Sequence, residues 1–143
     1  MLSTLALEVN SLSIHLNRYA RRADDALGVP PARLSALSVL VFGGDRTITQ
    51  LADAEQVSLP TISRVVDGLE EVGLARRVPN PDDARSVLIR ATAKGRRVMD
   101  RGRQARVDRL TRVLEAVPVA DRPAVEQGLR ALRHALTEVL AAE

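Results

Sequence analysis

The chain contains no cysteine and no tryptophan, and its aromatic side chains amount to one phenylalanine and one tyrosine. The lack of cysteine excludes disulfide bonds, thiolate zinc sites and thiol redox sensors. The shortage of aromatic rings excludes an aromatic cage, so a small-molecule pocket would be lined by aliphatic side chains. Hydrophobic residues make up 45% of the 143 positions, which suffices for the core of one domain.

Other absences narrow the classes of function. The sequence lacks an apolar run of roughly 18 residues, so no membrane-spanning helix is predicted. Glu8 precedes every basic residue, unlike the start of a signal peptide, and we expect a cytoplasmic protein. There are two histidines, without paired-histidine metal spacing, and no glycine-rich phosphate loop. These absences argue against an enzyme, a metal site and a bound cofactor.

The net charge is only +3, but it is distributed unevenly along the chain. Residues 76–112 carry 12 of the 21 basic side chains and 4 of the 18 acidic ones. Such a concentration is typical of a surface that faces a polyanion. A solvated helix face would show the same pattern, so the charge alone does not assign a function.

Hydrophobic periodicity predicts a mainly α-helical chain. Helices are expected over residues 4–27, 31–42, 47–56, 59–72, 93–116 and 121–141. Thr49 is expected to cap the third helix and Ser58 the fourth, where Pro60 fits the first turn. The helical regions at the two ends carry apolar stripes without a core of their own, so we predict a homodimer that buries them.

A basic hairpin lies between the fourth and fifth helices, with expected strands at 74–78 and 86–90 around a polar tip. Its arginines are Arg76, Arg77, Arg85 and Arg90. Because Arg76 and Arg77 are adjacent on a strand, they point to opposite faces, and at most one of them faces DNA squarely. Arg90 lies near the base of the hairpin, where it either reaches a phosphate or braces the hairpin.

The helix over residues 59–72 separates into an apolar face and a polar face. The apolar face carries Ile62, Val65, Val66 and Leu69. The polar face presents hydroxyls and a guanidinium near its N-terminus, and such groups suit phosphate oxygens and base edges. The residues of this helix predicted to contact DNA are Ser58, Pro60, Thr61, Ser63 and Arg64. The alternative is an ordinary amphipathic surface helix, but the basic hairpin that follows favours DNA binding.

Residues 48–95 resemble the winged helix–turn–helix of MarR-type transcriptional regulators. The resemblance rests on LADAEQVSLPTISRVVDGLEEVGLARR and on the wing sequences DARS and ATAKG. Ala91 stands where leucine is usual, which affects one packing contact and not the DNA surface. The resemblance implies a mainly α fold with an α+β wing. The DNA lobe would span 31–92, and dimerisation helices at 1–27 and 93–143 would flank it.

The resemblance also implies how the chain would act. An obligate dimer would bind a pseudo-palindromic operator in double-stranded DNA, with the helix in the major groove and the wing in the minor groove. By the D-x-R pattern, Arg85 is the wing arginine and Asp83 orients it, although a local salt bridge without a DNA role is the alternative. The wing residues predicted to contact DNA are Arg76, Arg77, Arg85, Ser86 and Arg90.

Many MarR-like repressors respond to small, often anionic aromatic or phenolic effectors, and the resemblance therefore implies a ligand cleft. Its candidate residues are His15, Asn17, Arg18, Tyr19 and Ser38. An exposed or dimer-interface position suits His15 better than a place in the ligand cleft. The alternative to a ligand-responsive repressor is a winged-helix module that dimerises or coats DNA without a small-molecule signal.

Overall fold

The computed structural model describes residues 1–142, so Glu143, at the end of the predicted dimerisation region, lies outside the described residues. The elements in chain order are α1 (Leu2–Arg21), η1 (Asp24–Leu27), α2 (Pro31–Gly43), β1 (Arg46–Thr47), α3 (Ile48–Glu55), α4 (Leu59–Glu71), β2 (Ala75–Pro79), β3 (Val87–Ala91), α5 (Ala93–Glu115), η2 (Val119–Asp121) and α6 (Arg122–Ala142). The fold is mainly α with a small antiparallel sheet, as predicted.

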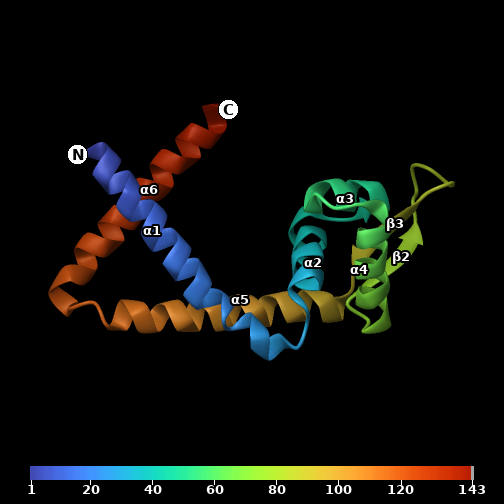
Figure 1. Ribbon diagram of the computed structural model, residues 1–143, viewed down its shortest axis with the longest axis horizontal. Coiled ribbons are helices and arrows are strands. Elements are labelled where there is room, and N and C mark those ends of the chain that lie inside the picture. Colours follow the sequence, from blue (N-terminus) through green and yellow to red (C-terminus); the bar gives the residue numbers. More distant parts are fainter. Residues whose placement is uncertain (143) are drawn as a thin grey trace.

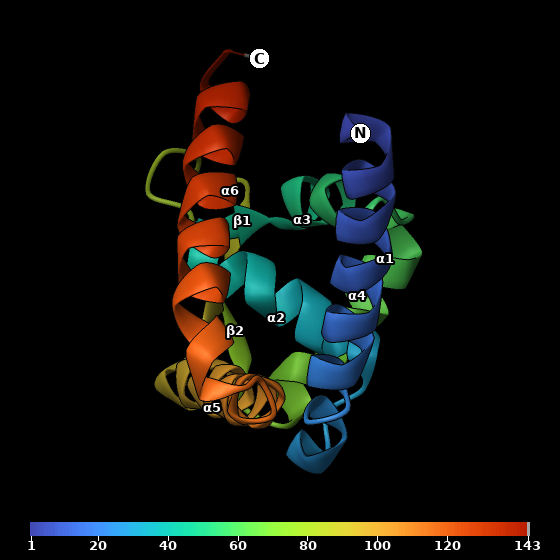
Figure 2. The same cartoon turned by 90° about the vertical axis from the view of Figure 1, so that its left-hand side faces the viewer.

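Three parts are visible in Figure 1: a compact lobe, a long connecting helix and two helical arms. Helices α2, α3 and α4 and the sheet form the lobe at one end of α5, and α1 and α6 are the arms. The arms cross in Figure 1 but stand apart in Figure 2, so they do not pack along each other. Helix α1 packs instead on α5, where the guanidinium carbon of Arg109 lies 4.3 Å from the centroid of the Tyr19 ring.

The hydrophobic core lies in the lobe and includes the first turns of α5. Its largest fully buried side chains are Leu37, Leu40, Leu51, Ile62, Val66, Leu69, Leu74 and Ile89. Each contributes about 1.5–3 kcal/mol when it leaves water. The sheet has the order β1-β3-β2 and is antiparallel, so Ile89 of the central strand reaches into this core. The polar face of α4 is thereby turned outward.

Capping explains where the lobe helices begin. Thr47 accepts from the Gln50 N–H at 3.2 Å and its own N–H donates to the Gln50 side chain at 3.0 Å, a capping box for α3. The prediction of Thr49 as this cap is wrong, because the helix begins two residues earlier, at the end of the unpredicted strand β1. Ser58 caps α4 as predicted, accepting from the Thr61 N–H at 3.4 Å.

The first helix is shorter than its apolar pattern predicts. It ends at Arg21 rather than at residue 27, and a 3₁₀ turn follows it. Gly28 ends that turn in the left-handed region, with φ +66°, where a residue without Cβ is favoured. The chain can then reverse into α2, whose first residue is Pro31.

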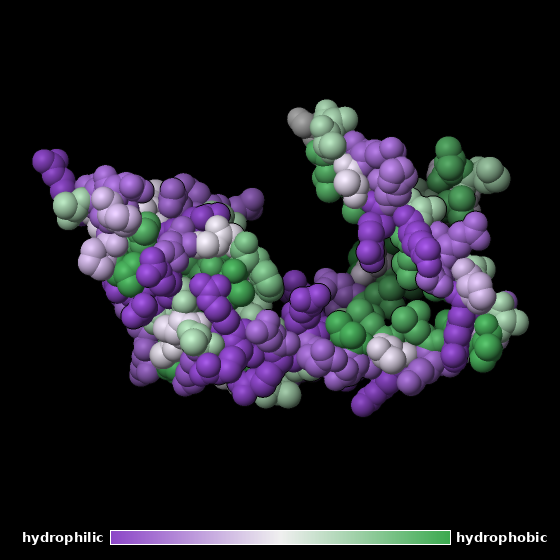
Figure 3. All heavy atoms as spheres, turned by 180° about the vertical axis from the view of Figure 1, so that it is seen from behind, coloured by the Kyte–Doolittle hydropathy of each residue, from purple (hydrophilic) through white to green (hydrophobic). Residues whose placement is uncertain are grey.

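The arms keep their apolar stripes exposed in the single chain. Exposed apolar residues on α1 and α6 include Leu5, Val9, Leu12, Leu129, Leu132, Leu136 and Val139. Figure 3 shows hydrophobic side chains gathered in the hollow that the arms and α5 enclose. Among the described helices none is by itself long and apolar enough to cross a membrane. Only 2–27 and 31–43 taken together, bent by 97°, meet that test of length and composition.

Candidate nucleic-acid interface

The outer face of α4 is held in place by its buried side. Ile62 and Val66 are at most 1% exposed, so the helix cannot roll without opening the core. On the opposite side Thr61 and Arg64 are exposed, and Arg64 forms no ion pair with any residue from 1 to 142. The predicted contact residues Ser58, Pro60, Thr61 and Arg64 are all exposed, whereas Ser63 is half-buried.

The wing tip is ordered by its own polar side chains. The Asn80 side-chain amide donates to the Ser86 hydroxyl at 2.8 Å across the hairpin. Asp83 accepts the main-chain N–H of Arg85 at 2.9 Å. The Asp83 carboxylate therefore orders the Arg85 backbone, not its guanidinium, and the exposed Arg85 side chain extends from a fixed turn.

The four wing arginines are not equivalent. Arg77 forms ion pairs with Asp67 and Glu70 of α4. Arg90 donates from Nε and Nη2 to Asp45 at 2.8 and 2.7 Å, and this hydrogen bonding and charge raise the pKa of Arg90 further. This ion pair favours the brace among the two alternatives for Arg90.

Arg76 and Arg85 differ from the two braced arginines. Both are exposed, and neither has an ion-pair partner among residues 1–142. Arg76 is paired in register with Arg90 on β3, so it shares a face with Arg90 and points away from Arg77. Two cations of the wing are thereby free for an external anion, and two are tied within the lobe.

A cavity of about 470 Å³ lies between helix α1 with the η1 turn and helices α2 and α5. It is lined by residues of α1, η1, α2 and α5, among them Asn17, Asp24, Leu34, Ser38, Met99 and Arg106. Of the predicted cleft residues, Asn17 and Ser38 line it. His15, Arg18 and Tyr19 do not, because each lies elsewhere around the circumference of α1. His15 instead bonds the Ser11 carbonyl at 2.7 Å, on the exposed face of that helix.

Asp24 and Arg106 form a wall of the cavity that the sequence did not predict. Arg106 of α5 pairs with Asp24 of η1 at 2.6 Å, which links two segments 82 positions apart. A Cβ on Gly102 would lie 2.9 Å from Leu27 Cδ1, so the lack of a side chain at Gly102 allows the η1 turn to pack closely against α5. The basic run on α5 was visible in the sequence, but nothing local to it indicated which arginine meets an aspartate.

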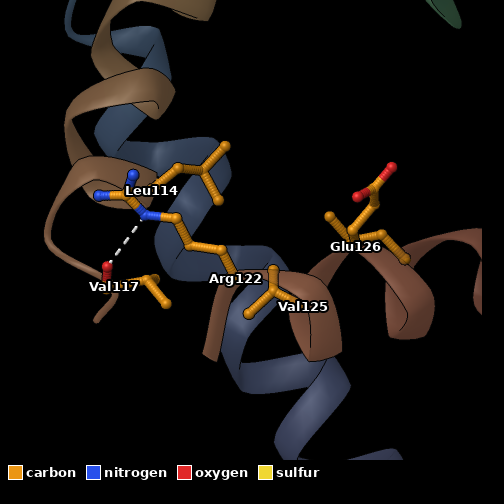
Figure 4. Close-up of a pocket in the computed structure, with 6 residues that line it drawn as sticks. Leu114, Val117, Arg122, Val125 and Glu126 are labelled. Carbon is orange, nitrogen blue, oxygen red and sulfur yellow. Dashed lines mark hydrogen bonds between the residues drawn. The ribbon is translucent and has the colours of Figure 1, made fainter. Parts of the chain in front are cut away.

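A second hollow, of about 250 Å³, lies at the corner where α5 turns into α6. Leu114, Val117 and Val125 line it, and Figure 4 shows Arg122 folded across the corner toward the Val117 carbonyl, to which it donates at 3.2 Å. The hollow is apolar and open to the space between the arms. Within the described part of the chain, no three His, Asp or Glu side chains come together as a metal site.

Known proteins match this chain both over the lobe alone and over most of its length. A family model described as the MarR family matches residues 27–86. An HTH-type transcriptional regulator of Mycobacterium bovis is 30% identical over 118 residues, which cover 82% of this chain and 82% of the relative.

Two solved structures share the architecture. A transcriptional regulator from Thermotoga maritima aligns with a TM-score of 0.88 at 19% identity, covering 97% of this chain and 98% of that one. A mutant of S. aureus MepR bound to an oligodeoxyribonucleotide aligns with a TM-score of 0.72 at 17% identity, covering 92% and 97%. At these identities the likeness establishes the fold.

Proposed function

Because the chain belongs to the MarR family of DNA-binding transcriptional regulators and not to an enzyme family, we propose that it acts as a homodimer on a pseudo-palindromic operator and represses transcription there. The lobe over residues 31–92 reads the DNA, and the helices of 1–27 and from 93 onward join the two copies. A bound dimer excludes other proteins from the same duplex, which makes repression the direct consequence of binding. The proposal places the chain in the cytoplasm, with its DNA.

The observation that carries this proposal is the free guanidinium of Arg64 on the outer face of α4. It stands beside exposed hydroxyls at the N-terminal half of the helix, above a side that is fully buried. The major groove, about 12 Å wide, admits an α-helix, and arginine to guanine is the commonest specific contact. Arg85 on the ordered wing tip is suited to enter the neighbouring minor groove, and Arg76 to hold a phosphate.

The dimer is supported by the exposed apolar stripes of α1 and α6. Leu132 is 53% exposed and Leu136 59% exposed, at a helical spacing that gives one continuous stripe. A second copy supplies the same surface, so a two-fold arrangement would bury both sets at once. Two recognition helices related by a two-fold axis then require a palindromic site.

The effector cleft of this proposal is the cavity between helix α1 and the lobe. Its size suits a small ligand, and it combines Leu34 and Met99 with the charged pair Arg106–Asp24. A ligand there would contact both the lobe and α1, and would change how they are held relative to each other. A dimeric DNA-coating module without a signal remains the second candidate.

Selection of bound sites from random duplex DNA tests the proposal. We expect an enriched palindrome with half-sites about 10–10.5 bp apart. Arg64→Ala should relax the selected sequence at one position and cost about 1–3 kcal/mol. Arg112→Ala, which removes the same charge from the exposed side of α5, is the control. Equal loss of affinity for operator and random DNA on Arg64→Ala would exclude base reading, and the absence of any enriched motif would favour the coating module.

A further inference from the structure

We infer that Arg77 is a positioning residue, which fixes the wing against the recognition helix and makes no contact with DNA. The inference rests on the proposed function, because it concerns how the two DNA-contacting elements are held. It departs from the prediction that placed Arg77 among the wing residues that contact DNA, and agrees with the expectation that at most one of Arg76 and Arg77 faces DNA. The residues that carry it are Arg77 of β2 and Asp67 and Glu70 of α4.

Three contacts join strand β2 to helix α4 at this point. The Arg77 guanidinium donates from Nη2 to Asp67 Oδ1 at 2.9 Å and from Nη1 to Glu70 Oε2. The Arg77 main-chain N–H donates to Glu70 Oε1 at 2.8 Å. The Glu70 carboxylate thus accepts hydrogen bonds from both the main chain and the side chain of Arg77. The resulting link has a defined geometry, unlike an ordinary surface ion pair held by two flexible side chains.

The position of β2 in the sheet explains why such a link is needed. The strand order is β1-β3-β2, so β2 has a partner on one side only. An N–H on the outer edge of β2 has no neighbouring strand to accept it. Glu70 takes the place of that strand at Arg77, and it attaches the base of the wing to the helix before it.

The charges also decide against a phosphate contact. Asp67 and Glu70 lie on the helix that enters the groove, where free carboxylates would repel the DNA backbone. Arg77 pairs with both carboxylates within the lobe and offsets one of their two negative charges, and its side chain is only 35% exposed. Withdrawing Arg77 toward a phosphate would leave both carboxylates unpaired beside the polyanion. The guanidinium fork reaches two carboxylates at once, which a lysine ammonium on a single flexible stem does not reproduce.

Glu70→Ala separates the two roles because they predict opposite signs. If Arg77 positions the wing, the loss of Glu70 lowers operator affinity about fivefold, despite the removal of a negative charge near DNA. If Arg77 binds phosphate, the same variant removes one of its two competing carboxylates, leaving only Asp67, and therefore raises affinity and steepens the salt dependence. Glu71→Ala is the matched control: it removes a neighbouring exposed carboxylate that has no ion pair within residues 1–142. It should leave affinity unchanged or raise it slightly.

Substitution of Arg77 itself gives the second measurement. We expect Arg77→Lys to lose operator affinity about as much as Arg77→Gln, with the slope of log K against log salt unchanged in both. A phosphate contact would survive in the lysine variant, and the glutamine variant would lower the slope by about 0.9. That second pattern would overturn the inference.

A measurement without DNA keeps the inference distinct from the proposed function. Amide hydrogen exchange should show the Arg77 N–H protected in the wild-type chain and exposed in Glu70→Ala. The Arg85 N–H, which Asp83 holds, should keep its protection in the same variant. A wild-type chain that selects no DNA sequence would count against the proposed function alone. An Arg77 amide that exchanges equally fast with and without Glu70 would refute the brace.

Discussion

Replacing Gly95 by alanine is a direct test of how closely α5 approaches the base of the wing. A Cβ at residue 95 would lie 2.2 Å from the Leu74 carbonyl oxygen and 3.0 Å from Leu37 Cδ1. The Leu74 carbonyl is held, because it accepts the Thr92 N–H at 3.0 Å, and the Thr92 hydroxyl donates to Gly73 at 2.6 Å. The nearest obstacle is therefore a backbone carbonyl held by a hydrogen bond, and a movement of the Leu37 side chain alone would not relieve the contact.

The size of the effect follows from this contact. A carbon and an oxygen approach to about 3.3 Å, so α5 must shift by ~1 Å, and forcing extra volume into a packed site costs about 1–3 kcal/mol. The shift also strains the bond from the Gly95 N–H to the Thr92 hydroxyl, and loss of such a cap costs ~1 kcal/mol. Because alanine has a higher helix propensity than glycine, the substitution also stabilises the helix by about 1 kcal/mol, which offsets part of this cost. We expect a net destabilisation of about 1–3 kcal/mol.

Gly128→Ala is the control for this experiment. Gly128 lies within α6, and its added Cβ would meet nothing within 4 Å in the single chain. It should stabilise the protein by about 0.5–1 kcal/mol. Urea unfolding at one fixed protomer concentration measures both variants, since the stability of a dimer depends on concentration. If Gly95→Ala is as stable as the wild type, or gains as much as the control, the reasoning from the Leu74 contact is wrong.

Three further changes test other parts of the molecule. Arg76→Ala should weaken binding to every duplex and lower the salt slope by about 0.9, as measured by titrations at several salt concentrations; an unchanged slope would argue against a phosphate contact. Leu132→Asp should convert the dimer to monomer in sedimentation at micromolar concentration, and a surviving dimer would place the interface elsewhere. Thr47→Ala removes the capping box of α3 and should lower the free energy of unfolding by about 1 kcal/mol. A variant as stable as the wild type would show that the capping box does not stabilise the protein.

Helices and turns that are specified by neighbouring residues in the sequence were predictable. The apolar spacing on α4 placed Ile62, Val66 and Leu69 in the core, and Ser58 and Pro60 marked its first turn. The strands of the wing lie one residue later than predicted, because their ends depend on pairing across the hairpin. The resemblance to MarR-type regulators supplied the family, which the sequence of the wing alone would not have named.

Features that depend on distant residues were not predictable. Strand β1 has two residues, and it exists because they pair with Leu88 and Ile89. The partners of Arg77, Arg90 and Arg106 come from other elements, so a count of arginines along the chain does not distinguish the braced ones from the free ones. A charge pattern indicates how many cations a surface has. The fold decides which of them remain available.

Helix α5 spans the distance between the contact of Arg109 with α1 and the contact of Gly95 with the wing. At ~1.5 Å per residue this stretch is about 21 Å long. A rotation of about 10° at the Arg109 end, of the order seen in switching proteins, would carry the lobe sideways by ~4 Å. That is about one base-pair step along DNA, where successive pairs are ~3.4 Å apart. In the proposed dimer the helix would act as a lever arm, and a small change of angle beside the cavity would place two recognition helices out of register with their half-sites.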